Sequence, residues 1–248
     1  MRILLTNDDG ITSPGITLLA EALRGAGHRV FLVAPNKNRS GASHSINFLN
    51  EPIKLKETEK DTWSCSGTPV DCIVVSLLGG IPEIDIEKDT PCMVLSGINR
   101  GANLGTDITY SGTAAAARQG SIFGIPSVAL SLVENKNEWH WENSISFFIE
   151  KFEEIKALWK AGTFVNINFP NIPEGPSALV SAFPSKRNYN DRMINYLSPQ
   201  GRLYCFAKFG NTETKKETGS DWDEVMKNNA AYSIIVSQPV SVTEGGSP

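Results

Sequence analysis

Two adjacent carboxylates, Asp8 and Asp9, follow a short apolar strand at the start of the sequence. In an open α/β sheet, ligands bind at the carboxyl ends of the strands, so we expect both side chains at the edge of a crevice. Bare carboxylates repel a phosphate, whereas Mg²⁺ or Mn²⁺ binds carboxylate oxygens and links them to it. The strand tip is therefore interpreted as a metal site. The competing interpretation is that residues 7–10 are only a turn, because Asn, Asp and Gly all favour turns.

A second polar segment, residues 35–45, follows the next apolar strand and so reaches the same sheet edge. Its hydroxyl and amide oxygens suit a metal, while Lys37 and Arg39 would attract a phosphate. His44 is open to two interpretations, a structural hydrogen-bonding residue or a proton donor. The segment is also compatible with a solvated polar loop that has no role in binding.

The longest polar segment, residues 96–114, is rich in Gly and Asn and shows no apolar period. It leaves a predicted strand at Ser96, which brings the amide oxygen of Asn99 to the edge that holds the two aspartates. At its far end, backbone N–H groups and hydroxyls meet the positive end of a helix dipole, which predicts a phosphate site at Ser111, Gly112 and Thr113. The alternative is a loop shaped by turn chemistry alone, although the segment is long for a simple connection.

Alternating strand and helix patterns position these segments. Apolar runs that suit strands buried on both faces occur at residues 3–5, 29–34, 93–96, 127–132 and 163–169. Helical spacing, with Pro near several starts and Gly near several ends, predicts helices at 14–25, 69–79, 112–123 and, as one long amphipathic helix, 139–160. This order is typical of an α/β fold with a doubly wound, mostly parallel sheet.

The pattern changes after Pro170, where prolines mark irregular connections and a polar stretch ends in an apolar–polar alternation over residues 203–208. Such a stretch fits a projecting β-hairpin or arm better than a core layer. The predicted organisation is a catalytic core domain, an arm with a closing segment, and a disordered tail, over residues 1–184, 185–242 and 243–248 respectively.

The composition excludes several classes of protein. The 248 residues carry a formal net charge of −4 and form no long basic run, which argues against binding to duplex nucleic acid. No stretch approaches the ~20 apolar residues of a membrane span, and the first residues do not form a signal peptide, so we expect a cytoplasmic protein without membrane contact. The cysteines lack CxxC spacing and are expected to be reduced and free of zinc: Cys65, Cys72, Cys92 and Cys205.

Five motifs, in order, resemble the SurE family of metal-dependent survival-protein nucleotidases: MRILLTNDDGITSPG, APNKNRSGASHSI, SGTPVDC, SGINRGANLG and TYSGTAAAA. They lie within residues 1–130, and residues 165–170 are a weaker match. The resemblance implies a Rossmann-like fold and one divalent metal ion per subunit, held by Asp8, Asp9, Ser40 and Asn99. Asn36 stands where the family often has Asp, which removes none of these ligands. The resemblance also implies a C-terminal arm exchanged between subunits, and hence a homodimer or homotetramer.

The activity implied is release of phosphate from nucleoside 5′- and 3′-monophosphates, sometimes from short polyphosphate, which makes the protein a 5′-nucleotidase. The predicted catalytic residues are Asp8, Asp9 and Asn99, with Asp9 orienting or deprotonating the attacking water. Candidates for contact with substrate are Asn36, Arg39, His44 and Asn103. A dinucleotide-dependent enzyme would need G-x-G-x-x-G after the first strand, where this chain is acidic. A non-catalytic nucleotide-binding module is the remaining alternative, and it would need no acidic metal pair.

Overall fold

The computed structural model describes residues 1–84, 88, 90–134 and 138–241, and its centre is a sheet of nine strands in the order β3-β4-β2-β1-β5-β6-β7-β13-β8. Six consecutive neighbours are parallel: β4 (Thr62–Cys65), β2 (Arg29–Pro35), β1 (Arg2–Thr6), β5 (Met93–Arg100), β6 (Ser127–Leu132) and β7 (Thr163–Phe169). Antiparallel pairing occurs where β3 (Leu55–Glu59) joins β4 and where β13 (Ala230–Val236) joins β7, while β8 (Leu179–Ser181) lies parallel to β13. The predicted α/β fold with a mostly parallel sheet is confirmed.

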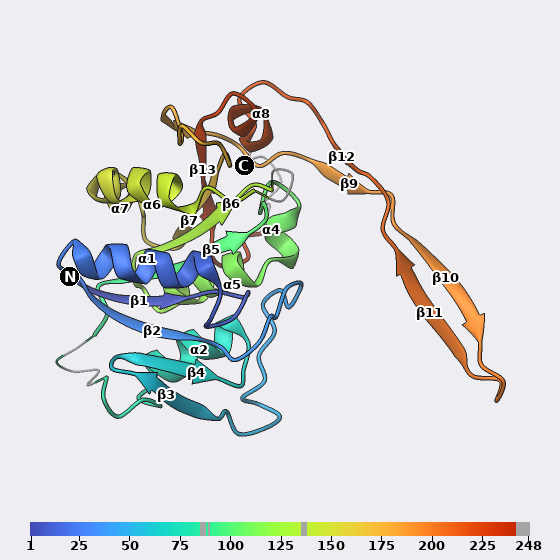
Figure 1. The fold of residues 1–248 in the computed structure, drawn as a ribbon, viewed down its shortest axis with the longest axis horizontal. Helices are drawn as coiled ribbons and strands as arrows, with labels where there is room; N and C mark the ends of the chain where they lie inside the picture. The colour runs from blue at the N-terminus through green and yellow to red at the C-terminus, as the bar shows by residue number, and fades with distance from the viewer. Residues whose placement is uncertain (85–87, 89, 135–137, 242–248) are drawn as a thin grey trace.

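Helices cover both faces of this sheet (Figure 1). One face packs against α1 (Pro14–Gly25), α6 (Trp141–Glu150) and α7 (Phe152–Leu158). The other face packs against α2 (Pro69–Leu77) and α5 (Gly112–Ile122). The short α8 (Asp221–Met226) lies beside β13, and α4 (Asp107–Tyr110) immediately precedes α5. The result is a three-layer arrangement.

Alternation along β1 shows why its sequence is continuously apolar. Ile3 and Leu5 point into the cluster that contains α1, while Leu4 points into the cluster that contains α2. All three side chains are fully buried. Because both faces of the strand are covered, the positions between Arg2 and Thr6 are all apolar.

The predicted single helix over 139–160 is wrong in one respect, because the structure divides it into α6 and α7 at Lys151. Lys151 has φ −91° and ψ 8°, outside the helical range. The bend keeps Phe148, Phe152 and Ile155 all buried against the sheet, and the first two rings meet edge to face at 5.7 Å. The apolar face therefore follows the twist of the sheet, which a straight helix of this length would not do.

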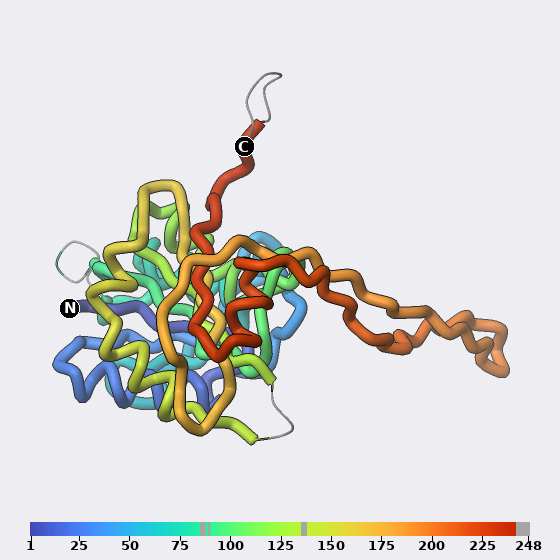
Figure 2. Tube along the Cα trace, turned by 90° about the horizontal axis from the view of Figure 1, so that it is seen from above, coloured from blue at the N-terminus to red at the C-terminus, as the bar shows by residue number. Residues whose placement is uncertain are grey.

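The C-terminal arm departs from the body of the molecule in both views (Figures 1 and 2). Its base is the antiparallel pair β9 (Arg187–Tyr189) and β12 (Thr212–Thr214), and its outer part is the hairpin of β10 (Arg192–Leu197) and β11 (Leu203–Lys208). After the arm the chain returns to the central sheet as β13. The tail predicted to be disordered, residues 243–248, lies outside the described residues, as does residue 242.

The structure also describes the state of the cysteines and the apolar character of the helices. All four cysteines are free; Cys65 and Cys72 are buried, whereas Cys92 and Cys205 are exposed. Among the residues that the structure describes, no helix is both long and apolar enough to cross a membrane.

Thr68→Ala tests how strongly the start of α2 is held. Thr68 accepts a hydrogen bond from the Asp71 N–H, the Asp71 carboxylate accepts one from the Thr68 N–H, and the Thr68 hydroxyl also donates to the Ser45 carbonyl at 2.7 Å. Losing the cap should lower the free energy of unfolding by about 1–2 kcal/mol in urea titrations. Thr68→Ser keeps the hydroxyl and is the control. An alanine variant as stable as the serine variant would contradict the role assigned to the hydroxyl.

Candidate active site

A bend at the carboxyl end of β1 presents the two aspartates. The Asn7 side chain is fully buried and exchanges hydrogen bonds with the backbone of Gly10, donating to its carbonyl at 2.9 Å and accepting from its N–H at 3.2 Å. Gly10 has φ +105°, which a residue with a side chain rarely adopts. The turn interpretation of this segment is thus correct as local structure, and the turn is what aims Asp8 and Asp9 at the sheet edge.

Asp8 is only 3% exposed and is held by the first turn of α5. The Thr113 hydroxyl donates to its carboxylate at 2.6 Å. A Cβ on Gly112 would lie 2.9 Å from the Cβ of Asp8, so the glycine permits this approach. Burial raises the pKa of Asp8 to about 6, and the nearby Asp9 adds to the rise, although hydrogen bonds from Thr113 oppose it. The helix terminus is therefore already facing an anion that belongs to the protein.

Asp9 and Asn99 come together because β1 and β5 are parallel neighbours. The Asp9 carboxylate accepts a hydrogen bond from the Arg100 N–H at 2.8 Å. Burial raises the pKa of Asp9, while the N–H and the charge of Arg100 lower it. The Asn99 amide group donates to the Gly101 carbonyl at 2.9 Å, which leaves the side-chain oxygen of Asn99 as its acceptor. β5 runs to Arg100, so Asn99 lies within the strand end and not in a loop beyond Ser96.

The polar segment after β2 packs against the bend at Asp8. The predicted site residues in this segment differ in exposure and in hydrogen-bond partners. The Arg39 N–H donates to the Asp8 carbonyl at 2.7 Å, and its guanidinium donates to the Ser66 carbonyl. Ser40 is exposed at the cavity. His44 contacts Gln119 at 2.9 Å, and burial lowers its pKa, so the imidazole is neutral at pH 7. Asn36 is exposed and donates its backbone N–H to the Cys65 carbonyl.

An open cavity of about 340 Å³ is lined by several of these residues. Further lining residues come from the loop after β5, from α4 and from the base of the arm. The cavity's predicted members are Asp8, Ser40, Asn99, Asn103 and Ser111. Its further members are Gly41, Arg100, Gly101, Ala102, Asp107, Tyr110 and Tyr189. Asn36, Arg39 and His44 are not among the residues that line this cavity. Gly112 and Thr113 do not line it either, because both pack against Asp8. The structure thus brings the predicted metal ligands Asp8, Ser40 and Asn99 to one cavity, with Asp9 beside it.

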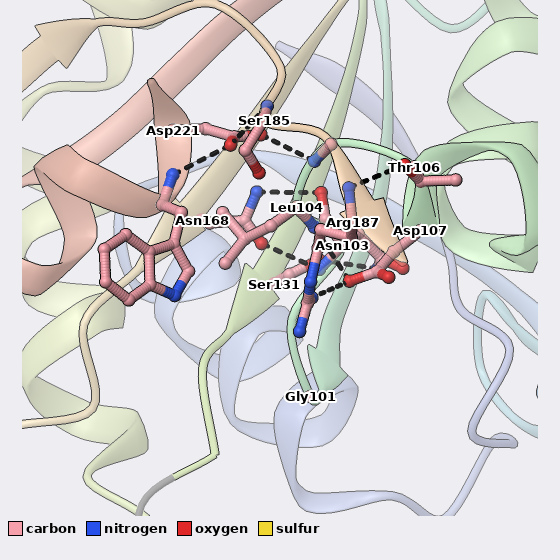
Figure 3. Close-up of polar contacts among 12 residues, drawn as sticks. Gly101, Asn103, Leu104, Thr106, Asp107, Ser131, Asn168, Ser185, Arg187 and Asp221 are labelled. Carbon is pink, nitrogen blue, oxygen red and sulfur yellow. Dashed lines mark hydrogen bonds and ion pairs between the residues drawn. The ribbon is translucent and has the colours of Figure 1, made fainter. Parts of the chain in front are cut away.

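Asn103 is tied into the protein on several sides (Figure 3). Its backbone N–H donates to the Asn168 side chain at 2.8 Å, and its carbonyl accepts from the Asn168 side chain. The carbonyl also accepts from the Asn166 side chain at 2.9 Å. Its own amide donates to the Ser131 hydroxyl at 2.8 Å. Asn166 and Asn168 are nearly fully buried, and they alternate with apolar residues on β7. Asn103 therefore shapes the cavity wall through the loop it anchors.

The base of the arm fixes the other end of this loop (Figure 3). The Arg187 guanidinium donates to the Asp107 carboxylate. The Tyr189 hydroxyl donates to the same carboxylate. Nearby, Asp221 accepts from the backbone N–H groups of Gly105, at 2.7 Å, and Ser185, at 2.8 Å. Sequence reasoning missed this cluster because its contacts join segments that are 36 to 116 positions apart, and no local pattern signals them.

The fold and the cavity define a Rossmann-like α/β protein with an acidic ligand site at the carboxyl edge of its parallel strands. Residues 3–191 match the family described as survival protein SurE. A protein named 5′-nucleotidase SurE from Xanthomonas campestris pv. campestris is 44% identical over 241 residues, which are 95% of this chain and 89% of that protein. One of the same name from Geotalea daltonii is 34% identical over 240 residues, covering 95% and 92%.

A solved structure supports the same assignment. The crystal structure of the SurE protein from Aquifex aeolicus covers 97% of this chain and 95% of its own, with a TM-score of 0.81 and 33% identity. The chain belongs to the SurE family, and the resemblance seen in the sequence is confirmed.

Asp8→Asn should make the metal-free protein more stable at pH 7. A carboxyl whose pKa is about 6 in the folded state and 3.8 when exposed binds more protons folded than unfolded, so its contribution to stability falls as pH rises from about 4 to 6. The neutral amide avoids this, and the gain should approach about 3 kcal/mol at pH 7 and vanish below pH 4. Denaturation in chelator across this range measures it. A difference independent of pH would contradict the assigned pKa.

Proposed function

We propose that the protein is a metal-dependent phosphomonoesterase that hydrolyses nucleoside monophosphates to a nucleoside and phosphate. The observation that carries the proposal is the convergence of Asp8, Ser40 and Asn99 on one cavity at the N-terminal end of α5. The relatives named 5′-nucleotidase SurE supply the class of reaction. The ester is cleaved by water, and the products are an alcohol on the sugar and inorganic phosphate.

The donor set suits a hard divalent cation, Mg²⁺ or Mn²⁺. Asp8 is nearly fully buried, yet no cationic side chain hydrogen-bonds to its carboxylate among the described contacts; its bonded partner is the neutral Thr113. A buried carboxylate without a countercharge is costly, and a bound cation would relieve that cost. Asp9, Ser40 and Asn99 would add one carboxylate and two neutral oxygens. In the described part of the chain, no three or more His, Cys, Asp or Glu side chains are placed so that they could hold a metal ion together, so neutral ligands are part of this proposal.

A bound divalent cation would polarise the phosphoryl group and favour ionisation of water. The residues of the chain have separate tasks around it. Asp9 keeps one oxygen on the Arg100 N–H and has the other free to orient or accept a proton from the attacking water. Ser111, which lines the cavity, would face the phosphoryl oxygens, and Thr113 acts through the Asp8 carboxylate it holds. Arg100, at the cavity wall, adds positive charge for the substrate.

The same phosphoryl site accepts 5′- and 3′-monophosphates, because both place a terminal phosphate on a nucleoside. The end of a short polyphosphate carries a similar group and would be a secondary substrate. The second candidate is a non-catalytic nucleotide-binding module. The acidic pair, of which Asp8 is buried, favours the enzyme, since a site that only binds phosphate gains nothing from two carboxylates beside it.

Removal of metal and substitution of Asp9 test this proposal together. Protein stripped with a chelator should release no phosphate from adenosine 5′-monophosphate, and Mg²⁺ or Mn²⁺ should restore release. Asp9→Asn should lower turnover about 100-fold, the effect of losing about 3 kcal/mol of transition-state stabilisation. A coupled phosphate assay measures both.

The control for the Asp9 substitution is Glu21→Gln, which removes an exposed carboxylate on α1. It should leave turnover unchanged. Full activity after rigorous removal of metal would refute the metal mechanism. Nucleotide binding without release of phosphate from any monophosphate, in either metal, would support the binding module instead.

We also propose that the arm joins subunits into a dimer or tetramer. β10 and β11 are exposed along their whole length, and apolar side chains occupy both faces of the hairpin: Met193, Ile194, Tyr196, Leu197, Leu203, Tyr204 and Phe206. A two-stranded hairpin is marginally stable alone in water, and these side chains add a hydrophobic patch on each face. A second copy of the chain offers matching surfaces on its own arm.

Tyr196→Asp should shift the protein toward monomers, because it buries a charge in the proposed contact. Light scattering at micromolar concentration should give two or four times the chain mass of 27.0 kDa for the wild type and a lower mass for the variant. Lys208→Gln, at the base of the same hairpin, is the control and should assemble normally. A monomeric wild type would exclude this role for the arm.

A further inference from the structure

The cavity extends beyond the groups assigned to metal and phosphate. Its outer wall is formed by Asp107, Tyr110 and Tyr189, which come from α4 and from the base of the arm. None of the three has a task in the hydrolysis proposed above. Two aromatic rings at the mouth of a polar cavity therefore need an explanation.

Tyr110 lies directly before Ser111, the residue that caps α5. Its side chain is 56% exposed, although a ring of this size normally gains from burial. Its backbone is well fixed, since the Tyr110 carbonyl accepts from the Ser43 N–H at 3.1 Å and the neighbouring Thr109 carbonyl accepts from the Ser43 hydroxyl at 2.7 Å. The ring is thus presented at a defined position next to the phosphate site, with its surface open.

Tyr189 completes the wall from a distant part of the chain. Its ring meets that of Tyr110 at 6.1 Å between centroids with an interplanar angle of 80°, an edge-to-face arrangement. The Tyr189 hydroxyl donates to Asp107, which also accepts from Arg187. Burial and the Asp107 carboxylate raise the pKa of Tyr189, so the phenol stays protonated and keeps this bond at neutral pH. Tyr189 therefore supports Tyr110 in one orientation.

We infer that Tyr110, supported by Tyr189, is the platform on which the base of a nucleoside monophosphate stacks. The inference rests on the proposed function and extends it to the specificity of the site. Every nucleobase has a π-face, so stacking binds nucleotides as a class without selecting one base. In an edge-to-face pair, the edge of one ring contacts one face of the other ring, so the remaining ring faces are available to a ligand.

The same geometry gives Asp107 and Arg187 a positioning role. Arg187 is also held at its backbone, where its N–H donates to the Thr106 hydroxyl at 3.0 Å. The Leu104 N–H donates to Asp107 at 3.3 Å, which ties the cavity loop to the same carboxylate. The base of the arm thus sets the position of the Tyr189 ring relative to the cavity.

The test compares a substrate that has a base with one that lacks it. Kinetics of phosphate release are measured with adenosine 5′-monophosphate and with glycerol 2-phosphate, for the wild type, Tyr110→Leu and Tyr189→Leu. Tyr110→Leu should lower kcat/KM for the nucleotide by roughly 5- to 150-fold, mostly through KM, with a much smaller effect on glycerol 2-phosphate. Tyr110→Phe keeps the ring and should restore the nucleotide kinetics. Phe123→Leu removes a partly exposed ring at the C-cap of α5, at the other end of the helix, and is the control.

A second readout does not depend on turnover. Saturation transfer from the protein to adenosine 5′-monophosphate, observed by NMR, should be stronger at the base protons H8 and H2 than on the ribose, and Tyr110→Leu should reverse that order. Equal loss on both substrates, or unchanged transfer to the base in Tyr110→Leu, would overturn the platform. A wild type that releases no phosphate from either substrate would refute the proposed function, and the NMR experiment would still decide whether the base stacks on Tyr110.

Discussion

The proposed active site depends on the burial of one carboxylate, that of Asp8, against the first turn of α5. The Thr113 hydroxyl and the helix terminus provide neutral hydrogen bonds, which lower the cost of burial without cancelling it, and the pKa of Asp8 remains raised to about 6. Gly112 is required because a side chain there would collide with Asp8. The fold thus keeps an incompletely neutralised charge at the proposed metal site, and this charge lowers the stability of the metal-free protein.

The remaining walls of the cavity are built by buried polar contacts between distant segments. The asparagines of β7 hold the loop at Asn103, and Asp221, from the segment after the arm, holds the N–H groups of Gly105 and Ser185. These contacts pair buried polar groups that would be costly to bury alone, and each joins positions that are 36 or more apart in the sequence. The cavity therefore forms only when the central sheet, the loop after β5 and the base of the arm are all in place.

The parts of the fold that could be predicted from the sequence are those set by local patterns. Continuous apolar strands, Pro at helix starts and the polar strand ends located β1, β2, α2 and α5, and the rule for strand ends placed Asp8, Asp9 and Asn99 together. The antiparallel pairings of β3 and β13 and the break at Lys151 were not predictable in this way, since they follow from packing on the sheet. Asp107, Arg187 and Tyr189 were missed for a related reason: an Asp, an Arg and a Tyr in separate polar segments carry no local signal of their contact.

The central claim is that Asp8 is buried in order to hold a divalent cation that the reaction requires. The most direct measurement is a titration of metal-free protein with Mn²⁺ in which metal binding, by calorimetry, and phosphate release from adenosine 5′-monophosphate are followed at the same concentrations. The account predicts one Mn²⁺ per chain, coincident curves for binding and activity, and loss of both in Asp8→Asn. Unchanged Mn²⁺ binding in Asp8→Asn, or activity that reaches its full value before any Mn²⁺ binds, would contradict it.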